Sequence, residues 1–484
     1  MKGVVSSGSL DTSKAGQFAF QQGGNAIDAL IASQLAAGIC EPLLTGLGGS
    51  GLAMVKYKGQ VYNVDLFTVM PGMQQQMSTE GISSTKTNIQ NIDLNFGTTT
   101  QRFIIGEGTI AVPSIPQGLA MLHERFGTIP LDILAKPALS LAKDGFTVSG
   151  SCAYLIKLLT PIIQQSSTMK KWFMPGGIHL QEGDKCHTPE LYDDIQHFIH
   201  SKSEFYKQGI YSESIKTLHN SIFSNSDIEN YKVIIKKSHS TKYRFGSLHT
   251  PPFPSIGGGI LRNGLHKSDE NNSSTIIRNL SESYIESMDS LAGVVQNSLG
   301  NTTHISTMDD TGNCAAMTTS LGESAGIVLP NTGVVLNNFL GEADVAHPEL
   351  MKHPGRRLLT MCTPTILETE NATWVLGSGG SNRIPGILMQ IIRRLNQGCS
   401  LKEAIVSPRF HTNLDIDGQL KEILAEQLSE SDESLLRLEY PTIDFKIFNA
   451  LNLYFGGVHM VGMERGELKG FGDPRRNGFC LYSY

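Results

Sequence analysis

The chain has 484 residues, of which 40% are hydrophobic and 17% are charged, with a formal net charge of −6. This length is sufficient for a large buried core, and the weakly acidic balance offers no basic surface for nucleic acid. The sequence contains no run of eighteen apolar residues and so predicts no membrane-spanning helix. We therefore expect neither nucleic acid nor a membrane as a partner.

The N-terminal residues and the cysteines both favour a cytoplasmic enzyme. Residues 1–16, MKGVVSSGSLDTSKAG, contain no apolar segment of the kind found in a secretory signal. The seven cysteines are scattered and none forms a CxxC pair, which argues against a disulfide scaffold or a zinc ribbon. We therefore expect reduced thiols, a cytoplasmic location and no metal or other cofactor.

The first half of the chain is predicted to be rich in helices. Residues 25–40 carry apolar side chains at helical spacing, and Asn25 can cap the start of this helix. Residues 52–66 alternate about the Lys58–Gly59 turn and predict a β-hairpin. Further helical segments are predicted at 119–127, at 130–146 and over most of 147–245.

The second half changes to strand patterns after a polar stretch at 267–300, which predicts an irregular helix and an accessible loop. Residues 304–320 predict two strands joined by a turn at 309–313, and residues 326–338 continue the strand character. Later segments predict a strand, a glycine turn and an amphipathic helix at 373–395, and a strand pair around Arg465–Gly466 at 454–484. Helices followed by antiparallel strands are typical of an α+β layered architecture.

The run Asn301–Thr302–Thr303 lies where the polar stretch meets the first of these strands. A threonine hydroxyl is a weak nucleophile unless a base lies beside it. If the Asn301–Thr302 bond is cleaved, Thr302 gains an α-amine, whose pKa of about 7.7–8.0 lets it accept the proton of its own hydroxyl. The same hydroxyl could first attack the Asn301 carbonyl and so release the amine. The tripeptide alone is a weak signal, because two β-forming threonines that open a strand are common.

The whole chain resembles the γ-glutamyltranspeptidase family in segments that follow the family's order. They include GNAIDA (24–29), EPLLTGLGGSG (41–51), PPFPSIGGG (251–259), TTHIS (302–306), GSGGSNRI (377–384) and DPRRNG (473–478). The resemblance implies an αββα four-layer sandwich, the α+β fold of the N-terminal nucleophile hydrolases, formed by a self-cleaved proenzyme. It also implies two fragments, residues 1–301 and residues 302–484, that remain together as a heterodimer and form one domain.

The resemblance assigns catalytic roles around Asn301–Thr302, which corresponds to the cleavage site. Thr302 corresponds to the nucleophile, and Ser320 stands at the position of a second hydroxyl that hydrogen-bonds it. Gly379 and Gly380 match the glycines whose N–H groups form the oxyanion hole. Because these residues lack side chains, their amides can approach an anionic tetrahedral oxygen closely.

The position that would bind the substrate α-carboxylate departs from the family pattern. Phe67 lies at or beside the position where the resembling enzymes carry an Arg, and no basic residue occurs between Lys58 and Lys86. The guanidinium–carboxylate fork is therefore missing here. Arg356 or Arg357 could replace it, although a surface pair or a structural ion pair is the more common role of such residues.

The remaining substrate-binding positions are also altered. Gly322 replaces an asparagine that helps to hold the glutamyl group, and Thr360–Met361 replaces paired serines. Glu342 is the better match for the acidic partner of the substrate amine, and Asp344 is the other candidate. These departures concern recognition of the acyl group and leave the residues assigned to acyl transfer in place.

We therefore expect a γ-glutamyltransferase-like amidohydrolase that cleaves γ-glutamyl amides such as glutathione through a threonyl acyl-enzyme, with transfer to water or an amine. Two alternatives stay open. The first is an acylase for another N-acyl or dicarboxylic amide, such as a glutaryl amide. The second is a catalytically inactive homologue that serves as a binding protein.

Two other patterns predict no further site. Residues 46–51 fit GxGxxG, but a helix precedes them and a hairpin follows, which is the reverse of a dinucleotide-binding unit. His197 and His200 lie one turn apart on a predicted helix without a carboxylate or cysteine cluster, so a solvated helix face is the better interpretation.

Overall fold

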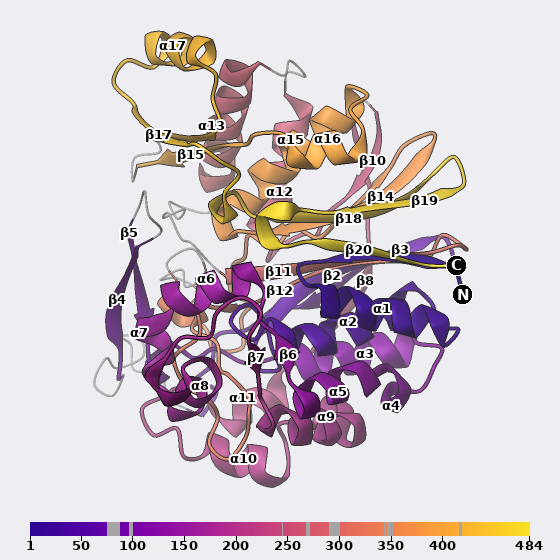
Figure 1. Ribbon diagram of the computed structural model, residues 1–484, viewed down its shortest axis with the longest axis vertical. Helices are drawn as coiled ribbons and strands as arrows, with labels where there is room; N and C mark the ends of the chain where they lie inside the picture. Colours follow the sequence, from indigo (N-terminus) through magenta and orange to yellow (C-terminus); the bar gives the residue numbers. More distant parts are fainter. Residues whose placement is uncertain are drawn as a thin grey trace.

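Two antiparallel sheets lie face to face at the centre of the molecule, and helices cover the outer face of each (Figure 1). The structure is a computed structural model that describes residues 1–74, 88–95, 100–243, 245–267, 272–289, 301–342, 345, 350, 352–415 and 419–484. The four layers confirm the predicted α+β class and the αββα sandwich.

The larger sheet combines strands that precede Asn301 with strands that begin at or after it. Its order is β20 (Phe479–Ser483), β1 (Gly3–Ser7), β11 (Asn301–Asp309), β12 (Cys314–Gly322), β2 (Ser50–Tyr57), β3 (Gln60–Leu66) and β8 (Ile234–Lys237). The predicted hairpin about Lys58–Gly59 and the predicted strand pair about 309–313 are both present. The two chain ends lie side by side, because Gly3 pairs with Ser483 (Figure 1).

The second sheet has the order β19 (Glu467–Gly472), β18 (Gly457–Glu464), β14 (Ala372–Gly379), β13 (Thr365–Glu368), β10 (Gly246–His249) and β9 (Thr241–Tyr243). Between the sheets lies a small apolar cluster that includes Met308 and Val375. Alternate residues of a strand face the same side. Thr302, His304 and Ser306 therefore share the face of Met308 that meets the second sheet.

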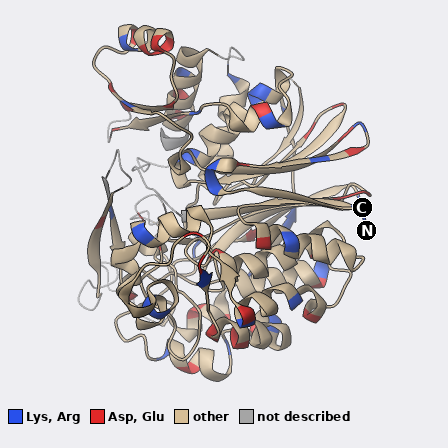
Figure 2. Ribbon diagram, viewed as in Figure 1, with Lys and Arg blue, Asp and Glu red and all other residues tan. Residues whose placement is uncertain are grey.

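The helices of the first half cover the larger sheet. Asn25 caps α2 as predicted, since its side chain accepts the N–H groups of Ile27 and Asp28. The layer contains α1 (Leu10–Gln21), α2 (Ala26–Cys40), α3 (Ile115–Phe126), α4 (Leu131–Leu134), α5 (Lys136–Asp144), α6 (Gly150–Leu158), α7 (Thr160–Ile163), α8 (Ser167–Phe173), α9 (Glu190–Ser201), α10 (Gly209–Ile215) and α11 (Asn225–Asn230). Short strand pairs accompany them: β4 (Gln90–Asn95) with β5 (Thr100–Ile105), and β6 (Phe146–Thr147) with β7 (Lys185–Cys186). In Figure 2, acidic and basic residues are interspersed over these helices.

A second helical layer covers the other sheet. It consists of α12 (Ile256–His266), α13 (Ser273–Asp289), α15 (Ile384–Asn396) and α16 (Leu401–Val406). Beside it stand a small sheet, β15 (Phe410–Leu414), β16 (Leu420–Glu426) and β17 (Asp444–Phe448), and α17 (Glu430–Glu439). Within the described ranges, no helix is both long and apolar enough to cross a membrane.

Two predictions for the middle of the chain need comment. Residues 326–338 do not continue the strand, which corrects the prediction: they form a loop with isolated bridges such as Val328 to Val335. Gly326 adopts a φ of +74° and Pro330 lacks a backbone N–H, so neither supports extended pairing. The predicted irregular helix is α13, while residues 290–300 of the predicted loop lie outside the described residues.

Candidate active site

Thr302 begins the regular part of β11, on the face that meets the second sheet. Its side chain is buried, and the β11–β12 register shifts between Asn301 and Thr302. Its cross-strand partner is Ser320, whose Oγ accepts the backbone N–H of Gly322 at 2.8 Å. The predicted nucleophile and the predicted second hydroxyl are thus neighbours.

The strand β14 approaches β11 closely through two glycines. A Cβ on Gly379 would lie 2.1 Å from the carbonyl oxygen of Thr302, and one on Gly377 would lie 2.2 Å from Cε1 of His304. Only glycine allows backbone to approach this closely. Gly380 follows with a φ of +123° and turns the chain away from the sheet. Gly379 therefore contacts Thr302, the predicted nucleophile.

Gly322 lies opposite Asn301 and beside a buried carboxylate. Its φ is +68°, and a Cβ there would lie 2.0 Å from Oε1 of Glu342 and 2.1 Å from Oδ1 of Asn338. The side chains of Glu342 and Asn338 occupy the space that a larger residue would need. Of the two predicted acidic candidates, Glu342 is therefore close to the start of β11, and Asp344 lies outside the described residues.

Thr360 and Met361 are buried just before β13. The Thr360 N–H donates to the carbonyl of Pro254, and the Thr360 carbonyl accepts the N–H of Ile256. The Thr360 Oγ1 accepts the N–H of Cys362 at 3.1 Å, which closes a local turn. Met361 belongs to the apolar cluster of the second helical layer.

Phe67 lies in the same apolar cluster and is only 1% exposed. Its ring centroid is 5.4 Å from that of Phe339. Phe339 begins the 3₁₀ turn η5 (Phe339–Gly341), which immediately precedes Glu342. Phe67 therefore supports this turn with apolar contacts and offers no cation.

Arg357 is engaged in a structural ion pair. Its Nε donates to Oδ2 of Asp65 at 2.9 Å, both side chains are largely buried, and the guanidinium lies 4.8 Å from the ring centroid of Tyr231. Arg356 is exposed. Of the two roles considered for these arginines, the geometry of Arg357 fits the structural ion pair.

His304 is the next inward-facing residue after Thr302. Its Nδ1 lies 2.8 Å from Oγ1 of Thr318, its Nε2 lies 2.9 Å from Oγ of Ser306, and the Ser306 hydroxyl donates to the carbonyl of His459. Because Ser306 has one proton, its oxygen accepts Nε2–H, and Nδ1 accepts the Thr318 hydroxyl. Burial lowers the pKa of His304 well below its usual value. Both ring nitrogens are occupied, so His304 cannot serve as the base for Thr302.

Arg476, which the sequence did not single out, reaches Thr302, the predicted nucleophile, from the C-terminal turn η8 (Pro474–Arg476). Its Nη1 donates to the carbonyl oxygen of Thr302 at 2.7 Å. Burial and the guanidinium of Arg383 lower the pKa of Arg476 to about 10, so it is still charged at neutral pH. It belongs to the matched segment DPRRNG, but only the fold brings it to Thr302.

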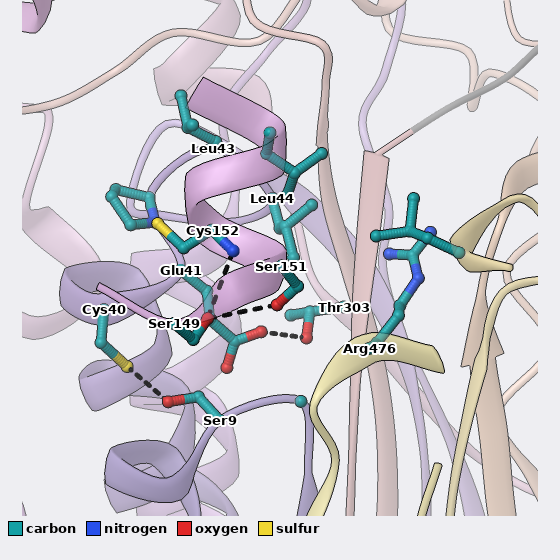
Figure 3. Close-up of a pocket in the computed structure, with 14 residues that line it drawn as sticks. Ser9, Cys40, Glu41, Leu43, Leu44, Ser149, Ser151, Cys152, Thr303 and Arg476 are labelled. Carbon is teal, nitrogen blue, oxygen red and sulfur yellow. Dashed lines mark hydrogen bonds between the residues drawn. The ribbon is translucent and has the colours of Figure 1, made fainter. Parts of the chain in front are cut away.

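A small pocket lies on the opposite face of β11, where Thr303 points (Figure 3). The Thr303 hydroxyl donates to Oε2 of Glu41 at 2.6 Å, and the Thr12 hydroxyl donates to Oε1 at 2.6 Å. Burial raises the pKa of Glu41. Arg476 lines the same pocket and so spans from it to the Thr302 carbonyl. Glu41 was also missed, although it opens the matched segment EPLLTGLGGSG.

Both histidines lie on α9, but the prediction of a solvated face holds only for His200, because His197 is half-buried. His197 stacks on Tyr211 with ring centroids 4.3 Å apart, and its Nε2 lies 3.0 Å from the carbonyl of Phe205. His200 Nδ1 lies 2.7 Å from the carbonyl of Gln196. Across the described part of the chain, no group of three His, Cys, Asp or Glu side chains could hold a metal ion.

Comparisons with known proteins find relatives that match nearly the whole chain. The glutathione hydrolase proenzyme of Bacillus subtilis (strain 168) is 26% identical, over 99% of this chain and 91% of that protein. The acylase ACY 1 proenzyme of Pseudomonas sp. (strain SE83) is 24% identical, over 90% and 88%. The crystal structure of cephalosporin acylase from Bacillus halodurans matches with a TM-score of 0.83 at 19% identity, over 99% of this chain and 95% of that chain.

The structural match shows a shared fold, and the sequence matches show more. The family description Gamma-glutamyltranspeptidase matches residues 12–275 and 261–482, which together span nearly the whole chain. The relatives named above are hydrolases and acylases that are made as proenzymes. This chain therefore belongs to the γ-glutamyltranspeptidase family, whose members are N-terminal nucleophile hydrolases.

Proposed function

We propose that this protein is a γ-glutamyltransferase-like amidohydrolase that activates itself by cleavage between Asn301 and Thr302. The observation that carries the proposal is the meeting of Thr302, Ser320 and Gly379 where the two sheets pack. The mature enzyme consists of residues 1–301 and residues 302–484. The fragments stay together because β11 lies between β1 and β12, and β12 in turn pairs with β2.

Activation is an intramolecular acyl shift followed by hydrolysis. The Oγ of Thr302 attacks the carbonyl carbon of Asn301, an ester bond forms, and the peptide C–N bond breaks. The hydroxyl proton ends on the nitrogen of Thr302. Water then hydrolyses the ester, which leaves a carboxylate on Asn301 and a free amine on Thr302.

In each turnover, the free amine of Thr302 is the base. It accepts the hydroxyl proton as Oγ attacks the substrate amide and passes the proton to the leaving amine. His304 cannot replace it, because both ring nitrogens are hydrogen-bonded elsewhere. Ser320, the cross-strand partner, hydrogen-bonds the Thr302 hydroxyl. Water or an acceptor amine then releases the acyl group.

The backbone N–H groups of Gly379 and Gly380 stabilise the tetrahedral oxyanion. The contact between Gly379 and the Thr302 carbonyl supports this role, because it sets β14 directly beside the reacting residue. Loss of one such donor costs about 10²–10³ in rate in other enzymes.

The γ-glutamyl group is held on the side of Glu342. The Glu342 carboxylate binds the substrate α-amine. Gly322, which has no side chain, leaves room for the carboxylate and for the amine. Thr360 and Met361 line the side of the acyl-binding site that lies opposite Glu342, and Phe67 supports this site with apolar contacts. The relatives named glutathione hydrolase favour a γ-glutamyl substrate.

A second candidate is an acylase for another dicarboxylic or N-acyl amide. Two observations favour it: Phe67 is apolar where an arginine is expected, and Arg357 is committed to Asp65. The relatives named acylase ACY 1 agree. The missing cation favours an N-acyl group without a carboxylate. A glutaryl group keeps the carboxylate and lacks only the α-amine, so its contact with Glu342 is what separates it from a γ-glutamyl group.

The test begins with denaturing gels and N-terminal sequencing of the purified protein. We expect two fragments, the second beginning at Thr302, and a single full-length band for Thr302→Ala. The mature protein is then assayed on paired γ-glutamyl and glutaryl anilides. Preference for the γ-glutamyl anilide supports the main proposal, and preference for the glutaryl anilide supports the acylase. An unprocessed and inactive natural protein would identify a non-catalytic homologue.

A further inference from the structure

Arg476 is a buried cation without a carboxylate partner among the residues that the structure describes. It is 5% exposed, its Nη1 donates to the Thr302 carbonyl, and its Nε has no hydrogen-bond partner. A buried charge that is not paired is costly. Groups of this kind concentrate at functional sites, where their field acts on a neighbour.

The neighbour is the nitrogen of Thr302. Covalent geometry fixes the nitrogen and the carbonyl oxygen of one residue roughly 3 Å apart. Because Nη1 of Arg476 lies 2.7 Å from that oxygen, the guanidinium lies within about 6 Å of the nitrogen. At this distance, inside a buried site, a positive charge strongly disfavours a second positive charge.

We propose that Arg476 is a positioning residue that holds the Thr302 carbonyl and keeps the terminal amine of the mature enzyme neutral. The inference rests on the proposed cleavage before Thr302. An unperturbed α-amine is largely protonated at pH 7, and only its neutral form can accept the hydroxyl proton. The guanidinium shifts the amine toward that neutral form without touching the substrate.

The other ionisable groups around the nucleophile divide by sign. On η6 (Ser381–Arg383), Arg383 adds positive charge, since it also lowers the pKa of Arg476. His304 on β11 and His459 on β18 are neutral, because burial lowers the pKa of each. Glu342, which follows η5, and Glu41, which follows α2, carry negative charge that opposes the positive charge of the arginines.

A variant of Glu41 tests the inference, because its expected shift in the pH profile is opposite to that of an Arg476 variant. Each carboxylate oxygen of Glu41 accepts a threonine hydroxyl, and the Glu41 charge partly offsets that of Arg476. Glu41→Gln keeps an acceptor for Thr303 while it removes the negative charge. The net positive potential at the amine then increases, because the opposing charge of Glu41 is gone.

The experiment is the pH dependence of kcat/KM for the mature enzyme, whose acidic limb reports the amine. We expect its midpoint below about 7.7 in the natural protein. Arg476→Gln should raise the midpoint by about one pH unit, Arg476→Lys should leave it near the natural value, and Glu41→Gln should lower it. Arg437→Gln removes an exposed guanidinium on α17 and is the matched control, with no shift.

N-terminal sequencing precedes each profile and separates the two proposals. Absence of a Thr302 terminus in the natural protein removes the proposed function, and this inference with it. A Thr302 terminus with the same midpoint in all variants removes this inference alone. If Arg476→Gln does not process itself, Glu41→Gln decides: a lowered midpoint supports the role of Arg476, and an unchanged or raised midpoint contradicts it.

Discussion

Arg475 and Arg476 are consecutive, both are buried, and they lie in opposite electrostatic surroundings. Arg475 donates through Nε and Nη2 to the carboxylate of Glu426, and through Nη1 to Asp473 at 3.3 Å. Asp473 also pairs with Arg409, and all four side chains are fully or nearly fully buried. Arg476 has the Thr302 carbonyl and no carboxylate within ion-pair distance in the described residues.

The difference contrasts a buried charge that stabilises the fold, Arg475, with one that we propose acts on the amine of Thr302, Arg476. The Arg475 side is balanced, and it ties η8 to β16 and to the end of α16 through the carbonyl of Ile405. On the Arg476 side, Glu41 offsets the charge only from beyond ion-pair distance, so part of the positive field reaches Thr302. A balanced network costs stability when it is broken, whereas an unbalanced charge is itself a cost.

The largest effect is expected when the balanced ion-pair network around Arg475 is broken. In the uncleaved Thr302→Ala background, Arg475→Met should lower the free energy of unfolding by about 3–5 kcal/mol, because it leaves the buried carboxylate of Glu426 without its ion-pair partner. Arg476→Met should change it by less than about 1 kcal/mol. Denaturant unfolding measures both. Equal losses for the two variants would contradict the comparison.

The next effect tests how closely β14 must approach the nucleophile. Gly379→Ala places a methyl group 2.1 Å from the Thr302 carbonyl oxygen, so the strands must separate. We expect kcat to fall by about 10²–10³, the loss typical of a displaced oxyanion donor. Gly466→Ala is the control: it has a φ of +82° in the β18–β19 turn and open space around it. This control should cost about 1 kcal/mol of stability and leave kcat unchanged.

A smaller effect is expected at the second hydroxyl. Ser320→Ala removes the acceptor for the Gly322 N–H and the hydroxyl opposite Thr302. One lost hydrogen bond corresponds to about a tenfold decrease in kcat. Ser320→Thr should restore most of the rate. A full-rate alanine variant would show that the Thr302 hydroxyl needs no such partner.

The smallest effect concerns acid stability on the Arg476 side. Burial, with Arg476 nearby, lowers the pKa of His459 to about 4, below its usual 6.5. Between these values the unfolded chain binds the additional proton, so stability is lost as the pH falls below 6.5. Unfolding free energies should decrease by about 1 kcal/mol from pH 6.5 to 5.5 for this group. His459→Asn should flatten that slope in denaturant titrations, and an unchanged slope would assign the acid sensitivity to other groups.

Local patterns predicted much of the fold. The capped helix after Asn25, the hairpin at Lys58–Gly59 and the strand pair from Thr302 all depend on neighbouring residues, and each is present. The layered order followed from the family resemblance. The segment 326–338 failed because apolar, β-branched residues suggest strand even where a glycine with positive φ and a proline interrupt the backbone.

The site was predictable only where the chemistry lies in contiguous residues. The family resemblance assigned Thr302, Gly379 and Gly380 through short matched segments, and the structure places Gly379 in contact with Thr302. Arg476 lies 174 residues from Thr302 along the chain. Glu41 lies 262 residues from Thr303. Their roles depend on burial and on neighbours that only the packed sheets bring together.

The adjacent chain ends have a practical consequence. Gly3 and Ser483 are cross-strand partners on β1 and β20, so a short linker can join the two ends without disturbing the sheet. Opening the joined chain at Asn301–Thr302 then gives a circular permutant whose first residue, once an initiating methionine is removed, is the nucleophile itself. Such a polypeptide would carry the amine from its synthesis and would uncouple catalysis from maturation.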